Sequence, residues 1–274
     1  IDPENPYINI SLSDFYRKQG DDGKSYQYLK QGFANPELDI DTKVQILLAY
    51  YTVNEIYNDL KQEAFELAGI MVEAHPQEPK AYSIYADLLY QDEQYEKARE
   101  SFLKVISLDS GKYLVWEQLL FVESELGNFQ SMAEKSARAI ELFPQQPLLY
   151  LLSGVSNYQL KNYEQAVKDL ERGRKFVVGN DMMMAQFWSY LGDSYHQKGD
   201  NKESYKSYEK ALGLDPENSV VLNNYAYFLS LDGIELEKAE KMARKAVELD
   251  PDNSANQDTY GWVLYKMGNY EEAE

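Results

Sequence analysis

Gly23, Lys24 and Ser25 have the residue types that close a phosphate-binding loop. In such a loop, backbone amides cradle phosphate oxygens and the lysine reaches the terminal phosphates. The motif G-x-x-x-x-G-K-[ST] would place its first glycine at position 18, where this chain has Lys18. No strand is expected before these residues, so the sequence predicts a turn between two helices and no nucleotide site.

Metal-binding patterns are incomplete in the same way. Asp39 and Asp41 are not followed by the glycine and the distal glutamate of a calcium loop, and Ala255 takes the glycine position after Asp250 and Asp252. The absence of cysteine excludes thiolate metal sites and a disulfide framework. We therefore predict no metal ion and no cofactor.

The two histidines do not form a catalytic arrangement. His75 directly precedes Pro76, which is typical of a turn, and His196 has no second histidine near it in the sequence. Neither a zinc site nor a Ser–His pair is supported. Carboxylate pairs occur in any acidic helical protein and identify no general acid or base. The sequence predicts a non-catalytic protein.

The elements that position these residues come from an internal repeat of about 34 residues. Apolar residues recur at three- and four-residue steps, which indicates two helices in each repeat. Copies at a fixed spacing form a stacked array in which each repeat buries its apolar face against its neighbours. The predicted repeats are 6–39, 45–78, 79–112, 113–146, 147–180, 185–218, 219–253 and the incomplete 254–274.

The clearest copy, 185–218, has large residues at Trp188, Leu191 and Tyr195, small residues at Gly192, Ser204 and Ala211, and a closing Pro216. This pattern resembles the tetratricopeptide repeat (TPR) family, in its bacterial type. The resemblance implies an all-α fold, a right-handed TPR superhelix (α-α solenoid) of stacked antiparallel helix pairs. We expect one continuous solenoid over residues 1–274, with 36–41 and 181–184 as the places where the register slips.

The repeat also predicts helix ends and a close contact. Glycine or alanine on each helix lets the two backbones approach, so Gly192→Leu or Ala211→Leu should overpack the pair and cost about 1–3 kcal/mol. Second helices should begin after N-caps, first helices should end at left-handed glycines, and second helices should end before prolines. The residues are Asp200, Asn162 and Asn269; Gly127, Gly199 and Gly268; and Pro216 and Pro251.

Positions two, five, nine, twelve and thirteen of the repeat line a concave groove in TPR proteins, which holds an extended peptide or a partner helix. The resemblance therefore predicts a partner-binding surface, although a neighbouring repeat could instead bury any of these side chains. Aromatic residues interleaved with carboxylates suit a peptide that carries apolar side chains and Lys or Arg. The predicted residues are Asp87, Tyr90, Glu117, Phe121, Leu151, Val155, Tyr158, Asp193, His196, Tyr227, Asp258, Trp262 and Tyr265.

Other tyrosines are expected to pack within the array, including Tyr82, Tyr85, Tyr95, Tyr163, Tyr195 and Tyr270. Some TPR domains grip a chaperone's C-terminal carboxylates with Lys and Asn side chains. Here Lys80 and the pair Asn223-Asn224 are too far apart in the array, so we predict no binding of acidic C-terminal tails.

Net charge restricts the partner. The chain has 46 acidic and 27 basic residues, a net charge of −19, which argues against nucleic acid and anionic membrane surfaces. A protein or peptide partner, basic or neutral, is compatible with this charge. The longest apolar run, around Val44 to Val53, is too short to insert across a bilayer.

The ends of the chain resemble cuts through a longer array, because residues 1–5 repeat the pattern of 214–218 and the last repeat stops at Glu274. Residues 221–273 resemble the C-terminal repeats of exported bacterial TPR proteins, which favours a periplasmic or outer-membrane-associated location, with the cytoplasm still open. Two alternatives to a peptide-binding scaffold remain. The array could be a structural spacer that forms homodimers through exposed ends at 7–12 and 260–265, or it could present substrate to an enzyme domain of the same chain.

Overall fold

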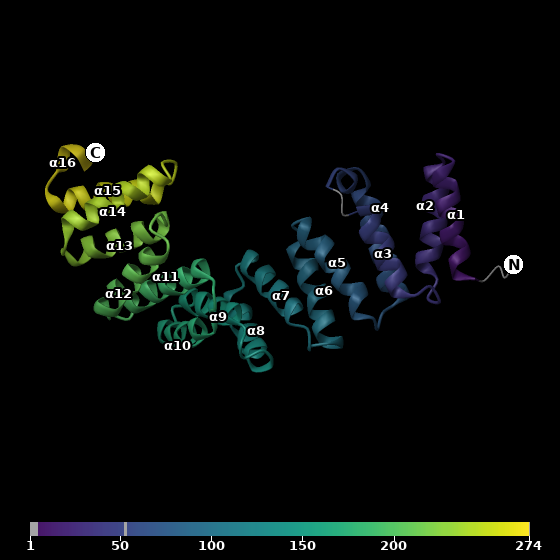
Figure 1. The fold of residues 1–274 in the computed structure, drawn as a ribbon, viewed down its shortest axis with the longest axis horizontal. Helices are drawn as coiled ribbons and strands as arrows, with labels where there is room; N and C mark the ends of the chain where they lie inside the picture. The colour runs from purple at the N-terminus through teal and green to yellow at the C-terminus, as the bar shows by residue number, and fades with distance from the viewer. Residues whose placement is uncertain (1–4, 52–53, 274) are drawn as a thin grey trace. The chain divides into compact units, whose positions relative to one another are not determined.

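The computed structural model describes residues 5–51 and 54–273, without the side chains of residues 50–60. Within these ranges the chain forms helices and short connections and has no strand (Figure 1). Two compact units are distinguished by their internal contacts, Ile1–Asn128 and Phe129–Glu274. The all-α fold of paired helices predicted from the repeat is confirmed.

The first unit contains three helix pairs and a further helix. Within each pair the helices pack against each other, and α4 also packs on α2 and α5, while α6 packs on α7. In Figure 1 the pairs follow one another in sequence order. The helices are α1 (Pro6–Lys18), α2 (Asp22–Ala34), α3 (Ile40–Tyr51), α4 (Asn54–Ala74), α5 (Pro79–Gln91), α6 (Tyr95–Leu108) and α7 (Tyr113–Glu125).

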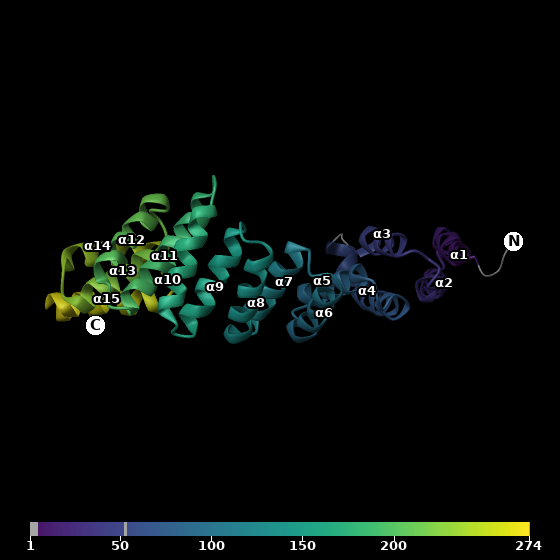
Figure 2. The ribbon, with the colours of Figure 1, turned by 90° about the horizontal axis from the view of Figure 1, so that it is seen from below.

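The second unit continues the alternation. Its pairs are α9–α10, α11–α12 and α13–α14. Contacts of α10 with α11 and of α12 with α13 join these pairs, while α8 packs on α9 and α15 packs on α14 (Figure 2). The helices are α8 (Phe129–Leu142), α9 (Pro147–Gln159), α10 (Tyr163–Gly173), the 3-10 turn η1 (Arg174–Phe176), α11 (Asp181–Gln197), α12 (Asn201–Leu214), α13 (Ser219–Asp232), α14 (Leu236–Leu249), α15 (Ser254–Met267) and α16 (Tyr270–Ala273).

Helix ends follow the predicted signals at most positions. Gly127, Gly199 and Gly268 have positive φ angles of 65°, 81° and 84°, as expected for left-handed caps. The Asp200 side chain accepts a hydrogen bond from the Glu203 amide at 3.4 Å. Asn162 is the N-cap residue of α10, as predicted, but its side chain makes no cap hydrogen bond.

A glycine on the first helix makes room for a large side chain of the second. A Cβ added to Gly192 of α11 would lie 2.6 Å from the ring of Tyr208 of α12, and one added to Gly154 of α9 would lie 2.5 Å from Leu170 of α10. Next to this contact, the buried Ser204 hydroxyl donates to the Gly192 carbonyl at 2.8 Å. These contacts hold the two helices of a repeat at short range, as the sequence pattern predicts.

Two places where the register slips have local explanations. The predicted repeat 45–78 begins inside α3, because that helix begins at Ile40 after the Asp39 carboxylate accepts the Thr42 amide at 2.8 Å. The extra residues 181–184 lengthen the start of α11, where the Asn180 side chain accepts the Met183 amide at 2.9 Å. No helix among the described residues has both the length and the apolarity to cross a membrane.

Candidate functional site

Every predicted groove residue lies on a first helix of a pair or on its equivalent. Asp87 and Tyr90 belong to α5, and Glu117 and Phe121 to α7, in the first unit. In the second unit they lie on α9 (Leu151, Val155, Tyr158), α11 (Asp193, His196), α13 (Tyr227) and α15 (Asp258, Trp262, Tyr265). Within each unit, we call the side of these helices that carries these residues the first-helix face of that unit.

Two of these residues are buried by the fold. Leu151 is 5% exposed and Asp193 is 6% exposed. The Asp193 carboxylate accepts hydrogen bonds from the Tyr208 hydroxyl and from Asn224 Nδ2, the latter at 3.2 Å. Burial raises the pKa of Asp193 to about 6, although both hydrogen bonds oppose the rise. Asp193 therefore joins α11, α12 and α13 within the array.

Three further predicted residues of the second unit are partly buried. The His196 ring stacks on Phe228 with centroids 3.7 Å apart, and burial lowers the pKa of His196. Tyr158 packs beside Tyr163 at 5.7 Å, and burial raises its pKa to about 12. Val155 is also partly buried. Their apolar parts thus contribute to packing between helices.

The C-terminal part of the face is exposed to solvent. Tyr227 and Trp262 are each 38% exposed and Tyr265 is 53% exposed. Trp262 and Tyr265 stack with centroids 5.7 Å apart, and Tyr265 meets Tyr270 of α16 edge-on at 5.3 Å. These rings have large faces that the described part of the fold leaves uncovered.

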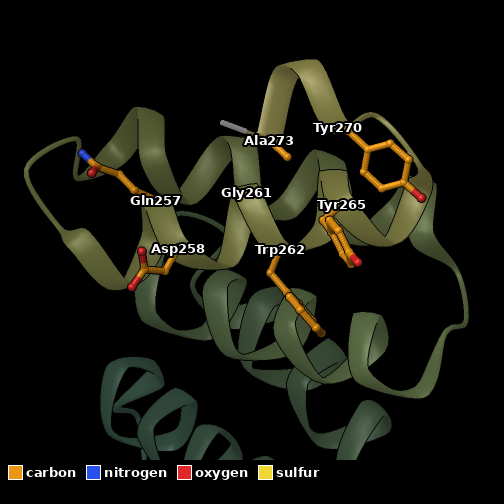
Figure 3. A pocket seen from close by; sticks show the side chains of 7 residues that line it. All are labelled: Gln257, Asp258, Gly261, Trp262, Tyr265, Tyr270 and Ala273. Atoms are coloured by element: carbon orange, nitrogen blue, oxygen red, sulfur yellow. The ribbon is translucent and has the colours of Figure 1, made fainter.

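Trp262, Tyr265 and Tyr270 line a hollow of about 690 Å³ on α15 and α16. Figure 3 shows Trp262 and Tyr265 projecting from successive turns of α15, with Asp258 one turn earlier and Tyr270 beside Tyr265. Gln257, Gly261 and Ala273 complete the lining. We call this site the aromatic hollow; it combines ring faces with one exposed carboxylate.

The face of the first unit has a second hollow, of about 510 Å³, between α5 and α7. Asp87 lines it, and this partly buried carboxylate has no hydrogen-bond or ion-pair partner among the residues whose side chains the structure describes. Burial alone raises the pKa of Asp87 to about 6. Glu117 is hydrogen-bonded to Tyr113 of the same helix. Tyr90 of α5 and Phe121 of α7 are partly buried.

The described residues contain no cluster of His, Asp and Glu that could hold a metal ion. Gly23, Lys24 and Ser25 form the first turn of α2, where Asp21 accepts the Lys24 amide at 3.1 Å and Ser25 is buried. The prediction of a turn at these residues is therefore wrong: the connection between the two helices lies at residues 19–21, and Gly23, Lys24 and Ser25 belong to α2 itself.

A buried amine was not anticipated from the sequence. Lys43 of α3 is fully buried; its Nζ donates to the Asn35 carbonyl at 2.8 Å and lies 2.7 Å from His75 Nε2. Burial lowers the pKa of Lys43 to about 8 and also lowers that of His75. The contact ties the α2–α3 connection to the end of α4. A repeat pattern cannot reveal it, because Asn35 and His75 belong to different predicted repeats and Lys43 lies between these two repeats.

The first-helix face therefore presents aromatic rings and carboxylates on a repetitive helical frame. A tetratricopeptide repeat family model matches residues 74–233 of the chain. The chain belongs to the tetratricopeptide repeat family. No curated protein sequence matches it.

Solved structures with the same TPR fold are distant in sequence. The APC/C hetero-tetramer Cut9-Hcn1 aligns with a TM-score of 0.60 at 16% identity over 95% of this chain, and this chain spans only 46% of that one. YrrB, described as a TPR protein with an unusual peptide-binding site, has a TM-score of 0.54 at 18% identity, covering 69% of this chain and 95% of its own. MamA 41-end from Desulfovibrio magneticus RS-1 has a TM-score of 0.57 at 17% identity, covering 64% of this chain and 96% of its own.

The TPR fold is that of a protein–protein interaction scaffold, and TPR proteins are in general non-catalytic. The structure adds residues to the predicted face. Tyr270, expected to pack within the array, is 61% exposed and lines the aromatic hollow, so that prediction is wrong. Leu114, 68% exposed at the rim of the Asp87 hollow, was missed, although it occupies position two of the repeat 113–146 and could have been found from the register alone.

The residues considered for binding an acidic C-terminal tail make contacts within the chain. Lys80 Nζ lies 2.5 Å from Asp41 Oδ1, and Asn224 donates to Asp193. Both contacts agree with the prediction that the TPR array does not bind acidic C-terminal tails, which stays a prediction.

Proposed function

We propose that this TPR protein binds a polypeptide along the first-helix face, and that the bound segment carries apolar and basic side chains. The observation that carries the proposal is the aromatic hollow, where Trp262, Tyr265 and Tyr270 expose large ring areas next to Asp258. Rings of this kind are the side chains that most often dominate binding energy at protein interfaces.

The negative charge of the chain supports the proposal that the bound polypeptide carries basic side chains. The chain carries a net charge of −19, and Asp258, Glu271 and Glu272 lie in or beside the hollow. A Lys or Arg side chain gains both from these carboxylates and from stacking on an exposed ring. YrrB, which shares the fold, has a peptide-binding site, and this agrees with the same general use here.

The test is a titration of labelled peptides into the full 274-residue chain, followed by fluorescence anisotropy. Two peptides share an aromatic and leucine content and differ only in carrying arginine or glutamate. We expect the arginine peptide to bind and the glutamate peptide to bind at least about tenfold more weakly. Equal affinity for the arginine and glutamate peptides would contradict the proposed preference for basic side chains.

Variants then locate the site. The double variant W262A/Y265A should lower the affinity for the arginine peptide by about tenfold or more, because two aromatic contacts are lost. Phe15→Ala removes another exposed ring, 54% exposed on α1, and serves as the matched control with unchanged affinity. If both variants bind like the parent chain, the aromatic hollow is not the contact surface.

A further inference from the structure

The Asp87 hollow contains a partly buried carboxylate that has no counter-charge and no hydrogen-bond partner among the described residues. Asp87 lies on α5, partly buried, and no described side chain or backbone amide hydrogen-bonds to it. Burial disfavours the ionised form and accounts for the whole rise in its pKa, to about 6. At neutral pH the group is thus mostly ionised, without a counter-charge.

Nearby charged groups are directed elsewhere. The Lys112 ammonium at the rim lies 3.8 Å from Asp109 Oδ2, and more than half of its side chain is exposed. On the opposite helix, Glu117 is hydrogen-bonded to Tyr113. Burial, and neither of these two residues, causes the raised pKa of Asp87. The carboxylate is therefore available to a cation from outside.

The walls of the hollow match a long, flexible cationic side chain. Phe102, 1% exposed, and Val115, 7% exposed, contribute buried apolar surface, and Leu114 adds an apolar rim that is 68% exposed. Such surfaces accommodate the methylene stem of Lys or Arg while its head group remains polar. Ser83 and Gln118 also line the hollow, and their oxygens can accept further N–H donors of a guanidinium group.

We propose that the Asp87 hollow receives one basic side chain, an arginine or a lysine, of the bound polypeptide. This rests on the proposed function and adds to it a specificity pocket on the first unit, separate from the aromatic hollow of the second. The attraction between Asp87 and the cation is strengthened by partial burial, because water screens the pair less than it would at an open surface.

The first experiment needs no polypeptide. The full chain, labelled with nitrogen-15, is titrated with N-acetyl-arginine methylamide and with the neutral isostere N-acetyl-citrulline methylamide. We expect the backbone amide signals of Ser83, Asp87, Leu114 and Gln118 to shift with the arginine probe and to shift at least about fivefold less with citrulline at equal concentration. Equal shifts with both probes, or shifts confined to other residues, would overturn the proposal.

Asp87→Asn keeps the shape of the side chain and removes its charge. We expect the arginine probe to lose its effect on these signals in this variant, while Glu100→Gln, which removes an exposed carboxylate of α6, leaves the effect intact. Removing an unpaired, partly buried charge should raise the melting temperature, so loss of folding is not expected. A second variant, Leu114→Ser, changes only an exposed side chain. It should weaken binding of the arginine probe, because it removes the apolar contact with the methylene stem of the probe.

The two proposals fail in different ways. If an arginine-rich peptide binds and W262A/Y265A weakens it while Asp87→Asn does not, the proposed function stands and the Asp87 pocket is wrong. If the arginine probe shifts the Asp87 signals but no peptide of the basic aromatic class binds, the pocket stands and groove binding of such peptides is wrong.

Discussion

Gly192 shows how much a single methyl group matters in this fold. An added Cβ would lie 2.6 Å from the Tyr208 ring, and Tyr208 is fully buried, so the ring has little room to move. We expect Gly192→Ala to lower the free energy of unfolding by about 1–3 kcal/mol through overpacking. Chemical denaturation followed by circular dichroism measures the change.

The matched control is Gly213→Ala on the partner helix α12, where an added Cβ meets nothing within 4 Å. This variant should be neutral or more stable by up to about 1 kcal/mol, because alanine is the better helix former. Equal destabilisation by both variants would show that the close contact at Tyr208 is not the cause.

The raised pKa of Asp193 predicts that the stability of the folded chain depends on pH. Its folded pKa is about 6, above the ordinary value of 3.8, so the folded chain holds this proton more tightly than the unfolded chain does. Protonation of Asp193 therefore stabilises the folded chain at pH 4, and this stabilisation is lost as the pH rises towards 6. The free energy of unfolding falls by at most about 3 kcal/mol over this range. The groups that face the carboxylate, Tyr208 and Asn224, keep their protonation state in this window.

Asp193→Asn isolates this effect, since the amide oxygen can still accept both hydrogen bonds. We expect the variant to gain stability relative to the parent chain between pH 4 and pH 7, measured as the difference between two denaturation series. A difference that does not change with pH would mean that Asp193 has an ordinary pKa in the folded chain.

At the scale of the helix, capping differs between elements that look alike in sequence. The Asn218 side chain accepts the Val221 amide at 3.1 Å at the start of α13, whereas Gln146 at the start of α9 makes no side-chain cap bond. We expect Asn218→Ala to cost about 1 kcal/mol and Gln146→Ala to cost much less. Thermal unfolding of the two variants checks this, and similar losses in both would contradict it.

The repeat pattern predicted the elements well because helix boundaries depend on local chemistry. Gly199 and Gly268 end their helices in the left-handed region, and α12 and α14 end at Leu214 and Leu249, before the predicted prolines. The second helix pair was harder to delimit. The predicted repeat 45–78 starts inside α3, and α4 runs from Asn54 to Ala74, longer than a standard second helix.

At the scale of the whole molecule, the net charge of −19 should govern binding to a basic partner. Raising NaCl from about 0.05 M to about 0.5 M shortens the Debye length several-fold and should weaken the arginine peptide by about tenfold or more. A peptide with the same aromatic residues and no charge should change little over the same range. Salt-independent binding of the arginine peptide would assign the affinity to ring contacts alone.

The sequence by itself determined the helices and their pairing, because a repeat period and its caps are local properties of the chain, and the resemblance to TPR proteins supplied the candidate residues. Only the tertiary structure decided which of these residues are free to bind. Asp193 and Leu151 are buried, whereas Trp262, Tyr265 and Tyr270 are exposed, although all belong to similar repeat positions or to residues expected to pack. Exposure and unmet charge, as at Asp87, depend on which side chains of adjacent helices meet a given residue, and a repeat pattern does not contain that information.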